Sequence, residues 1–359
     1  MNNHPNRTLD VRRAQPGFSL VELMVAMALG LLLVVGVGTV YLGSRQTYIQ
    51  QEALARMQEG ARYAFELLTL DIRQAGYTGC APIDDTFSTL NGTDWYNNLS
   101  ALPLAGYESG AGLPTDVSGA LANTDAVSVL RVDENSDYFV DSHNGPSAQF
   151  QLQANHDLKE GQILTVVPPD CSQAIVFQMT NVNDNDTIDV VVHNTGESSP
   201  GNSTKCLADP ADPVCASEST FPNLPENSRI MRLIGNIYYL GTGESGQPAL
   251  FRESLGVSGG NAQASASELV EGVEDMEILY GEDTTGDNNV DSYVAADAVV
   301  DWSNVLAVRV SLLMRSVENN VVSDSQQIEF AGETINAGVG ADRRLRKVFT
   351  TTIAVRNRL

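Results

Sequence analysis

A short acidic segment has the side-chain spacing of a calcium-binding loop. Oxygen-bearing side chains occupy alternate positions in it, at Asp283, Thr285, Asp287, Asn289 and Asp291. A hard cation prefers several carboxylate and carbonyl oxygens around a tight turn. The segment departs from the usual loop because Gly286 is fourth instead of sixth and Val294 replaces the bidentate Glu at the twelfth position. We expect weak calcium binding that orders the loop; an acidic turn between two strands is the alternative.

Two glycine motifs suggest other chemistry but lack the required context. Residues 241–246 fit the GxGxxG pattern of dinucleotide sites, and residues 256–260 fit the GxSxG pattern of serine hydrolases. A predicted strand follows the first motif where a helix is needed, and Glu244 would face phosphate. The second motif precedes a poor helix former, and the candidate bases His143, His156 and His193 all lie before its serine. We interpret the first motif as a hairpin turn, expect no serine catalysis at the second, and predict no catalytic or cofactor-binding residue.

A single carboxylate, Glu22, interrupts a long apolar run. Residues 18–42 contain no other charged side chain, and about 25 residues at 1.5 Å per residue can cross a bilayer core of about 30 Å as a helix. A carboxylate inside such a helix costs about 2.5 to 3.5 kcal/mol, so it indicates a function. The alternative is an interfacial residue that stays hydrated.

The residues before the run indicate its orientation and its processing. Arg7, Arg12 and Arg13 outnumber Asp10, which favours a cytoplasmic N-terminus and an exported remainder. A secretory signal has its small cleavage residue after the apolar run, whereas Gly17 lies before this one. Cleavage after Gly17 would remove the basic leader and leave the membrane helix attached.

Residues 17–22, Gly-Phe-Ser-Leu-Val-Glu, resemble the G-F-x-x-x-E processing motif of type IV prepilins. The resemblance implies that prepilin peptidase cleaves between Gly17 and Phe18 and that Phe18 is then N-methylated. It also implies that Glu22 pairs with the terminal amine of a neighbouring subunit, which offsets the cost of burying both charges.

The four cysteines all follow the membrane segment, so they can oxidise on the exported side. Four cysteines allow three connectivities. The prolines between Cys206 and Cys215 favour a compact loop, so we pair these two and leave Cys80 with Cys171 by elimination. Zinc binding is the alternative, but no Cys/His spacing supports it.

The composition is globular and strongly acidic. The chain has 359 residues, 42% of them hydrophobic, and a net charge of −24. Because the leader carries three Arg and one Asp, its removal leaves −26. Such a surface repels phosphate backbones, so no direct nucleic-acid binding is expected.

The elements that would position these residues form an α+β fold. Apolar residues continue at helical spacing after residue 42, and Gly76 is a plausible stop, so one helix is predicted over residues 18–75. Residues 80–123 are expected to form a long ordered loop. Short Val- and Ile-rich runs then predict a mostly antiparallel sheet with strands at residues 125–132, 162–167, 174–180, 187–193, 229–240, 249–255, 305–315, 327–330 and 347–355.

Four parts of the chain are therefore expected. Residues 1–17 are the leader, 18–42 the transmembrane half of the helix, 43–75 its amphipathic half and 76–359 a β-rich periplasmic head. The last strand carries a basic spot, interpreted as a solvated edge strand or, alternatively, as a docking surface for an acidic neighbour; its residues are Arg343, Arg344, Arg346, Lys347, Arg356 and Arg358.

Residues 300–315 and 343–358, together with residues 17–79, resemble PilW-type minor pilins of type IV pili. The resemblance implies a non-catalytic inner-membrane protein that primes pilus assembly and lies at the filament tip, outside the cell. Its implied partners are prepilin peptidase, other minor pilins, the major pilin, the assembly platform and a large tip adhesin.

Two other functions remain open on the sequence alone. A minor pseudopilin of a type II secretion system shares the leader and the general architecture. A membrane-anchored periplasmic enzyme is the second alternative, supported only by the two glycine motifs.

Overall fold

The computed structural model describes residues 17, 19–153, 156–184, 188–196, 198–209, 211–337 and 340–358. By its internal contacts the chain divides into two compact units, with the boundary after Glu52. The second unit, Ala53–Leu359, contains all the strands and the last part of the N-terminal helix. We call this unit the head.

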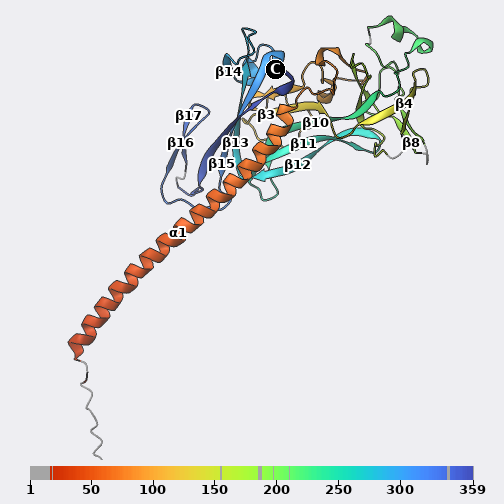
Figure 1. Cartoon of the computed structure of the whole chain (residues 1–359). Helices are drawn as coiled ribbons and strands as arrows, with labels where there is room; N and C mark the ends of the chain where they lie inside the picture. The colour runs from red at the N-terminus through yellow and green to blue at the C-terminus, as the bar shows by residue number, and fades with distance from the viewer. Residues whose placement is uncertain are drawn as a thin grey trace, which may run out of the picture. The chain divides into compact units, whose positions relative to one another are not determined.

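Helix α1 spans Leu20–Arg73 and is drawn in red to orange in Figure 1. Its predicted end agrees with the structure to within two residues. The helix stops before Gly76, which adopts φ +73°, a left-handed conformation that favours glycine. The N–H of Gly76 donates to the carbonyl of Leu130, so the chain passes directly from the helix to the sheet.

One apolar stripe on the last part of α1 packs against the strands of the head. Met57, Ala61, Ala64, Leu68 and Ile72 are buried, at the three- and four-residue spacing of one helix face. Leu54 and Phe65 on the same helix are only partly buried and pack against this core.

The larger sheet has twelve strands, and all of its strand pairs except β1 with β7 are antiparallel. Its strands are β1 (Thr86–Ser88), β2 (Leu104–Tyr107), β3 (Ala126–Val132), β4 (Tyr138–Asn144), β5 (Gln149–Gln153), β6 (Ile163–Val167), β7 (Ala174–Gln178), β8 (Asn181–Asp184), β9 (Ile188–Val192), β10 (Arg229–Thr242), β11 (Pro248–Ser258) and β12 (Asn261–Glu271).

Strand β10 is the centre of this sheet. Its first residues pair with β4 and β6, and its later residues pair with β3 and β11. Because the strand is 14 residues long, it connects two groups of strands that would otherwise be separate. Side chains of β10 therefore reach both the core under α1 and the core around β6 and β7.

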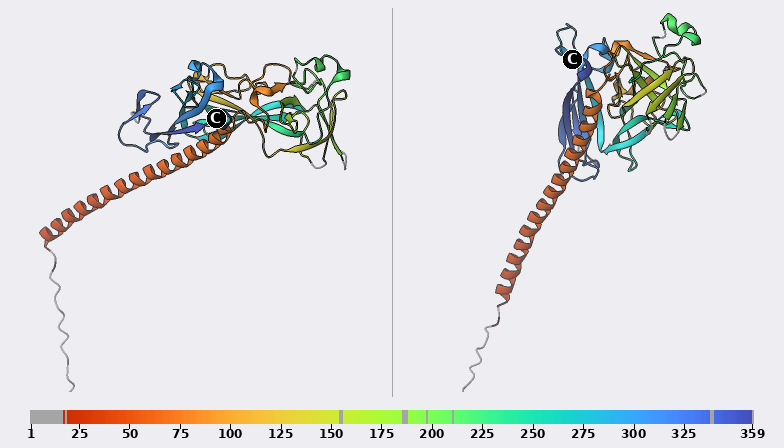
Figure 2. Two further views of the ribbon diagram at one scale, coloured as in Figure 1. Left: turned by 45° about the horizontal axis from the view of Figure 1, so that its top comes forward. Right: turned by 45° about the vertical axis from the view of Figure 1, so that its right-hand side comes forward.

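Two smaller sheets complete the head. The first has the order β14-β13-β15-β18, and the second is the hairpin of β16 and β17. The strands are β13 (Val273–Glu282), β14 (Ser292–Val294), β15 (Val305–Arg315), β16 (Gln326–Phe330), β17 (Glu333–Ala337) and β18 (Arg346–Ala354). The blue C-terminal strands and the yellow-green β4 to β9 region lie at opposite sides of the head in both views of Figure 2.

Short 3-10 turns connect several of these elements. They are η1 (Ile83–Asp85), η2 (Trp95–Asn97), η3 (Glu108–Gly110), η4 (Pro213–Ala216), η5 (Glu218–Thr220), η6 (Ala296–Ala298), η7 (Trp302–Asn304) and η8 (Arg356–Arg358).

The α+β class is confirmed, with a long N-terminal helix and a mostly antiparallel head, but the strand prediction was incomplete. The segment expected as a loop at residues 80–123 contains β1 and β2, and it buries Trp95 and Leu99 in the core. Strand β12 was missed because its Ala, Ser and Gln residues have low strand propensity. It forms because it pairs along its whole length with β11.

Both glycine motifs lie at hairpin turns, as was predicted for the first of them. Residues 241–246 lie at the turn between β10 and β11, where Gly243 donates its N–H to the carbonyl of Gln247. Residues 256–260 lie at the turn between β11 and β12, and Ser258 is the last residue of β11. Strands follow where a dinucleotide site or a nucleophile elbow would require a helix.

Candidate functional site

At the start of α1, Glu22, predicted from the processing motif, is hydrogen-bonded to its neighbour Ser19. Gly17 is exposed and lies outside the helix, whereas Phe18 lies outside the described residues. The backbone N–H of Ser19 donates to Oε2 of Glu22 at 2.8 Å, and the N–H of Glu22 donates to Oγ of Ser19 at 3.2 Å. These reciprocal bonds form a capping box, which fixes the first turn of the helix.

The residues after this cap are apolar and exposed. Leu31, Val34 and Leu42 are 66%, 69% and 62% exposed. Among the described residues, α1 is the one helix long and apolar enough to cross a membrane. So large an apolar surface requires a bilayer or neighbouring helices to cover it, because water would leave it unstable.

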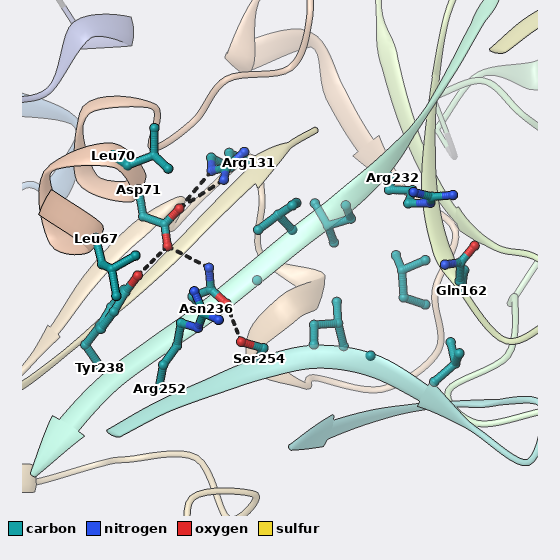
Figure 3. A pocket seen from close by; sticks show the side chains of 17 residues that line it. Leu67, Leu70, Asp71, Arg131, Gln162, Arg232, Asn236, Tyr238, Arg252 and Ser254 are labelled. Carbon is teal, nitrogen blue, oxygen red and sulfur yellow. Dashed lines mark hydrogen bonds and ion pairs between the residues drawn. The ribbon is translucent and has the colours of Figure 1, made fainter. Parts of the chain in front are cut away.

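A buried carboxylate anchors the other end of α1 to the sheet. Asp71 is 3% exposed, and its Oδ1 accepts hydrogen bonds from Nε and Nη2 of Arg131 on β3, at 3.1 and 3.0 Å. Its Oδ2 accepts from Nδ2 of Asn236 at 2.6 Å and from the hydroxyl of Tyr238 at 2.7 Å, both on β10 (Figure 3). With these four bonds the carboxylate is fully paired, so it fixes the helix on two strands.

The Asp71 carboxylate lies at one end of a recess of about 310 Å³, whose lining side chains are drawn in Figure 3. Three arginines line the recess, Arg131, Arg232 and Arg252, against the single acid Asp71. Arg232 also forms an ion pair with Asp157. Arg252 lies beside Tyr238, and the pKa of that tyrosine is raised well above its usual range, by burial first and then by Asp71.

The sequence did not identify these anchoring residues, although it contained one signal. Asp71 directly precedes Ile72 on the stripe that packs against the head, where a charged residue needs a buried partner. The partner, Arg131, is a charged residue in an otherwise Val- and Leu-rich strand. Nothing in the spacing of residues 71, 131 and 236 indicates that they meet.

The segment predicted to bind calcium forms the connection between β13 and β14. Oδ1 of Asp283 accepts the N–H groups of Thr285, Gly286 and Asp287, and its Oδ2 accepts the N–H of Asn288. Burial raises the pKa of Asp283, but these four donors outweigh it and the pKa is lowered. Backbone N–H groups of the loop therefore surround the Asp283 carboxylate and hydrogen-bond to it.

Asp291 closes the same loop from its other end. Its Oδ2 accepts the N–H groups of Thr284 and Thr285, at 2.8 and 3.0 Å. Among the described residues, the side chains of Asp287 and Asn289 bond only within this pair. No group of three His, Cys, Asp or Glu side chains able to hold a metal occurs in the described part of the chain.

Calcium binding stays a prediction, which calorimetry on the wild type and on Asp287→Ala would test.

The four cysteines form two disulfides in the pairing expected from the sequence, Cys80 with Cys171 and Cys206 with Cys215. The first joins the segment after α1 to the connection between β6 and β7, 91 residues apart. The second joins two cysteines that are nine residues apart in the sequence and so closes a short loop. The first disulfide therefore joins two connections of the head covalently, and the second closes a ring within the connection between β9 and β10.

Two family models match this chain. Residues 12–38 match the prokaryotic N-terminal methylation motif, which covers the cap and the first part of α1. Residues 237–357 match the family of type IV pilus-assembly protein W, from β10 to the end of the last sheet. No curated protein and no solved structure matches it. The two matched segments, one near each end of the chain, support its recognition as a PilW-type pilin.

Proposed function

We propose that this chain is a minor pilin that primes assembly of a type IV pilus and lies in the complex at the filament tip. The observation that carries the proposal is the match of residues 12–38 to a methylation motif at the capped start of an exposed apolar helix. The PilW match over residues 237–357 supports a pilus role for the head.

Processing would begin with cleavage between Gly17 and Phe18 by prepilin peptidase, followed by N-methylation of Phe18. Cleavage places a new amine on Phe18, one residue before Ser19 and four residues before Glu22. In the uncut chain Ser19 satisfies the Glu22 carboxylate. In the filament the amine of a neighbouring subunit would take over this role and set the register.

The proposed location and partners follow from this route. Before assembly the chain would cross the inner membrane once, with its N-terminus in the cytoplasm and its head in the periplasm. It would then enter the pilus, where the apolar half of α1 is covered by equivalent helices. Partners would be other minor pilins, the major pilin, the assembly platform and a large tip adhesin; the role is association and involves no catalysis.

The first test is the intact mass of the chain recovered from membranes of its native host. We expect a chain that starts at N-methylated Phe18. A chain that keeps Met1, or one cut after residue 42, would contradict the proposal.

Deletion of the gene then separates a pilus from a secretion role. We expect loss of surface pili and of twitching, with both restored by the wild-type gene. Normal pili together with exported enzymes retained in the periplasm would favour a pseudopilin instead. Turnover of a substrate by the purified chain would favour an enzyme.

A further inference from the structure

A second recess adjoins the one beside Asp71 and has the same charge pattern. It has a volume of about 660 Å³ and lies over the outer face of α1. Three arginines line it, Arg62, Arg73 and Arg356, against the single acid Glu66. The two recesses share Leu67 and Leu70, so they form one continuous surface. We call this surface the arginine groove.

Most arginines of the groove have no carboxylate partner. Within the part of the chain that the structure describes, Arg131 pairs with Asp71 and Arg232 with Asp157. Arg62, Arg73, Arg252 and Arg356 form no ion pair there, and Nε of Arg252 is buried without a hydrogen-bond partner. A buried N–H without a hydrogen-bond partner destabilises the site, and a bound acceptor would satisfy it.

The groove also has exposed apolar side chains, and one of its arginines is fixed in position by hydrogen bonds of its neighbour. Tyr63 and Leu70 are 47% and 53% exposed on the same helix face. Arg356 is positioned because its neighbour Asn357 donates to the carbonyls of Gln74 and Ala75, at 3.3 and 3.2 Å. Arginine beside an exposed Tyr is typical of the composition of protein interfaces.

We propose that the arginine groove binds an acidic polypeptide segment of another pilus subunit, with at least one apolar side chain that covers Leu70. Charge complementarity carries this inference, because the chain has a net charge of −24 and repels acidic partners elsewhere on its surface. A peptide fits better than a lipid headgroup layer, because side chains enter recesses of this size and a flat surface does not. The identity of the partner as a pilus subunit rests on the proposed function.

The test is photo-cross-linking from position 70 of the full-length chain in its native host. A photoreactive residue replaces Leu70, and the attached peptide is identified by mass spectrometry. The same residue at Val300, which is 88% exposed, reports background. We expect a cross-link from position 70 to a segment of net negative charge in another pilus subunit.

Charge reversal then tests the arginines directly. Arg73→Glu with Arg356→Glu should reduce the cross-link about tenfold or more. Lys159→Glu with Lys347→Glu alters the net charge equally at two exposed lysines outside the groove and should leave the cross-link unchanged. Arg73→Gln with Arg356→Gln should reduce it less, and circular dichroism of each variant checks its fold.

Four outcomes would overturn the inference: a cross-link to lipid, to a second copy of this chain, to a segment without net negative charge, or one unaffected by the reversal. If gene deletion abolishes pili and no cross-link forms, the groove inference fails and the proposed function stands. If the cross-linked acidic segment belongs to a secretion system, the groove binds acidic polypeptide and the proposed pilus role fails.

Discussion

Two regions of the head are rich in arginine, and they differ in how their charges are balanced. In the strand-end cluster, Arg346 donates to Glu274 and to Asp342, Arg315 donates to Glu274, and Arg344 donates to Asp342. In the arginine groove, four arginines have no described carboxylate partner. The first region is a stabilising network within the chain, whereas the second is open to a partner.

The sequence alone did not reveal this difference. The arginines at residues 343–346 were interpreted as a solvated edge strand or, alternatively, as a docking surface, but the fold places acids against them. Arg343 also donates to the carbonyl of Val322, at 2.9 Å. The four groove arginines without an ion pair come from α1, β11 and the 3-10 turn η8, so only the fold brings them together. A run of like charges in the sequence therefore indicates a binding partner only when the residues around it in space are also known.

The largest expected effect is at the anchoring carboxylate, because it is the most buried acid near the groove. The side chains of Asp71 and Arg131 are 4% and 10% exposed. Asp71→Ala should lower the free energy of unfolding by about 3 to 5 kcal/mol, since it leaves Arg131 buried without a counter-charge. Urea unfolding measures the change.

A double variant provides the control for this prediction. Asp71→Leu with Arg131→Met removes both charges and should restore most of the loss, because a packed apolar pair avoids the cost of desolvation. A loss below about 1 kcal/mol for Asp71→Ala would contradict the anchoring role.

A smaller effect is expected in the strand-end cluster. Glu274 accepts from Nε and Nη2 of Arg346 at 2.5 and 2.8 Å, and its side chain is 24% exposed. Glu274→Gln should lower the free energy of unfolding by about 1 to 2 kcal/mol. The matched control is Glu66→Gln, at an exposed acid of the groove, which should cost less than about 0.5 kcal/mol. Equal losses for the two variants would remove the distinction between the regions.

The pH dependence of the cluster gives the next effect in size. Burial raises the pKa of Asp342, but hydrogen bonds from Arg346 and Arg344 outweigh it and lower the pKa to about 2, from the ordinary 3.8. Since the folded pKa is depressed, this carboxylate stabilises the fold above about pH 4, and the contribution is lost as the pH falls towards 2. Its side chain is 41% exposed, so solvent screening keeps the energy small.

Asp342→Asn tests this contribution. The variant should be less stable than the wild type at pH 6 and equally stable near pH 2, as measured by thermal unfolding across that range. A stability difference that is constant with pH would indicate a packing effect and not a charge effect.

The sequence predicted those features that depend on local pattern. The apolar run and the strand at residues 305–315 could be predicted because their signals lie within one element. Strand β13 was missed because acids interrupt its apolar residues, and it is held by pairing with β15. The groove could not be predicted, because α1, β3, β10 and β11 meet there only through tertiary packing.

The smallest expected change in stability is at the groove arginines, and it most sharply distinguishes the groove from the strand-end cluster. Arg73→Gln with Arg356→Gln should change the free energy of unfolding by less than about 0.5 kcal/mol, because neither arginine has an ion pair to lose among the described residues. The variant Arg346→Gln removes contacts with Glu274 and Asp342 and should cost more than about 1.5 kcal/mol. Chemical denaturation of both variants at one pH gives the comparison. A groove arginine whose removal destabilises the head as much as Arg346 would be structural, and its charge would not be available to a partner.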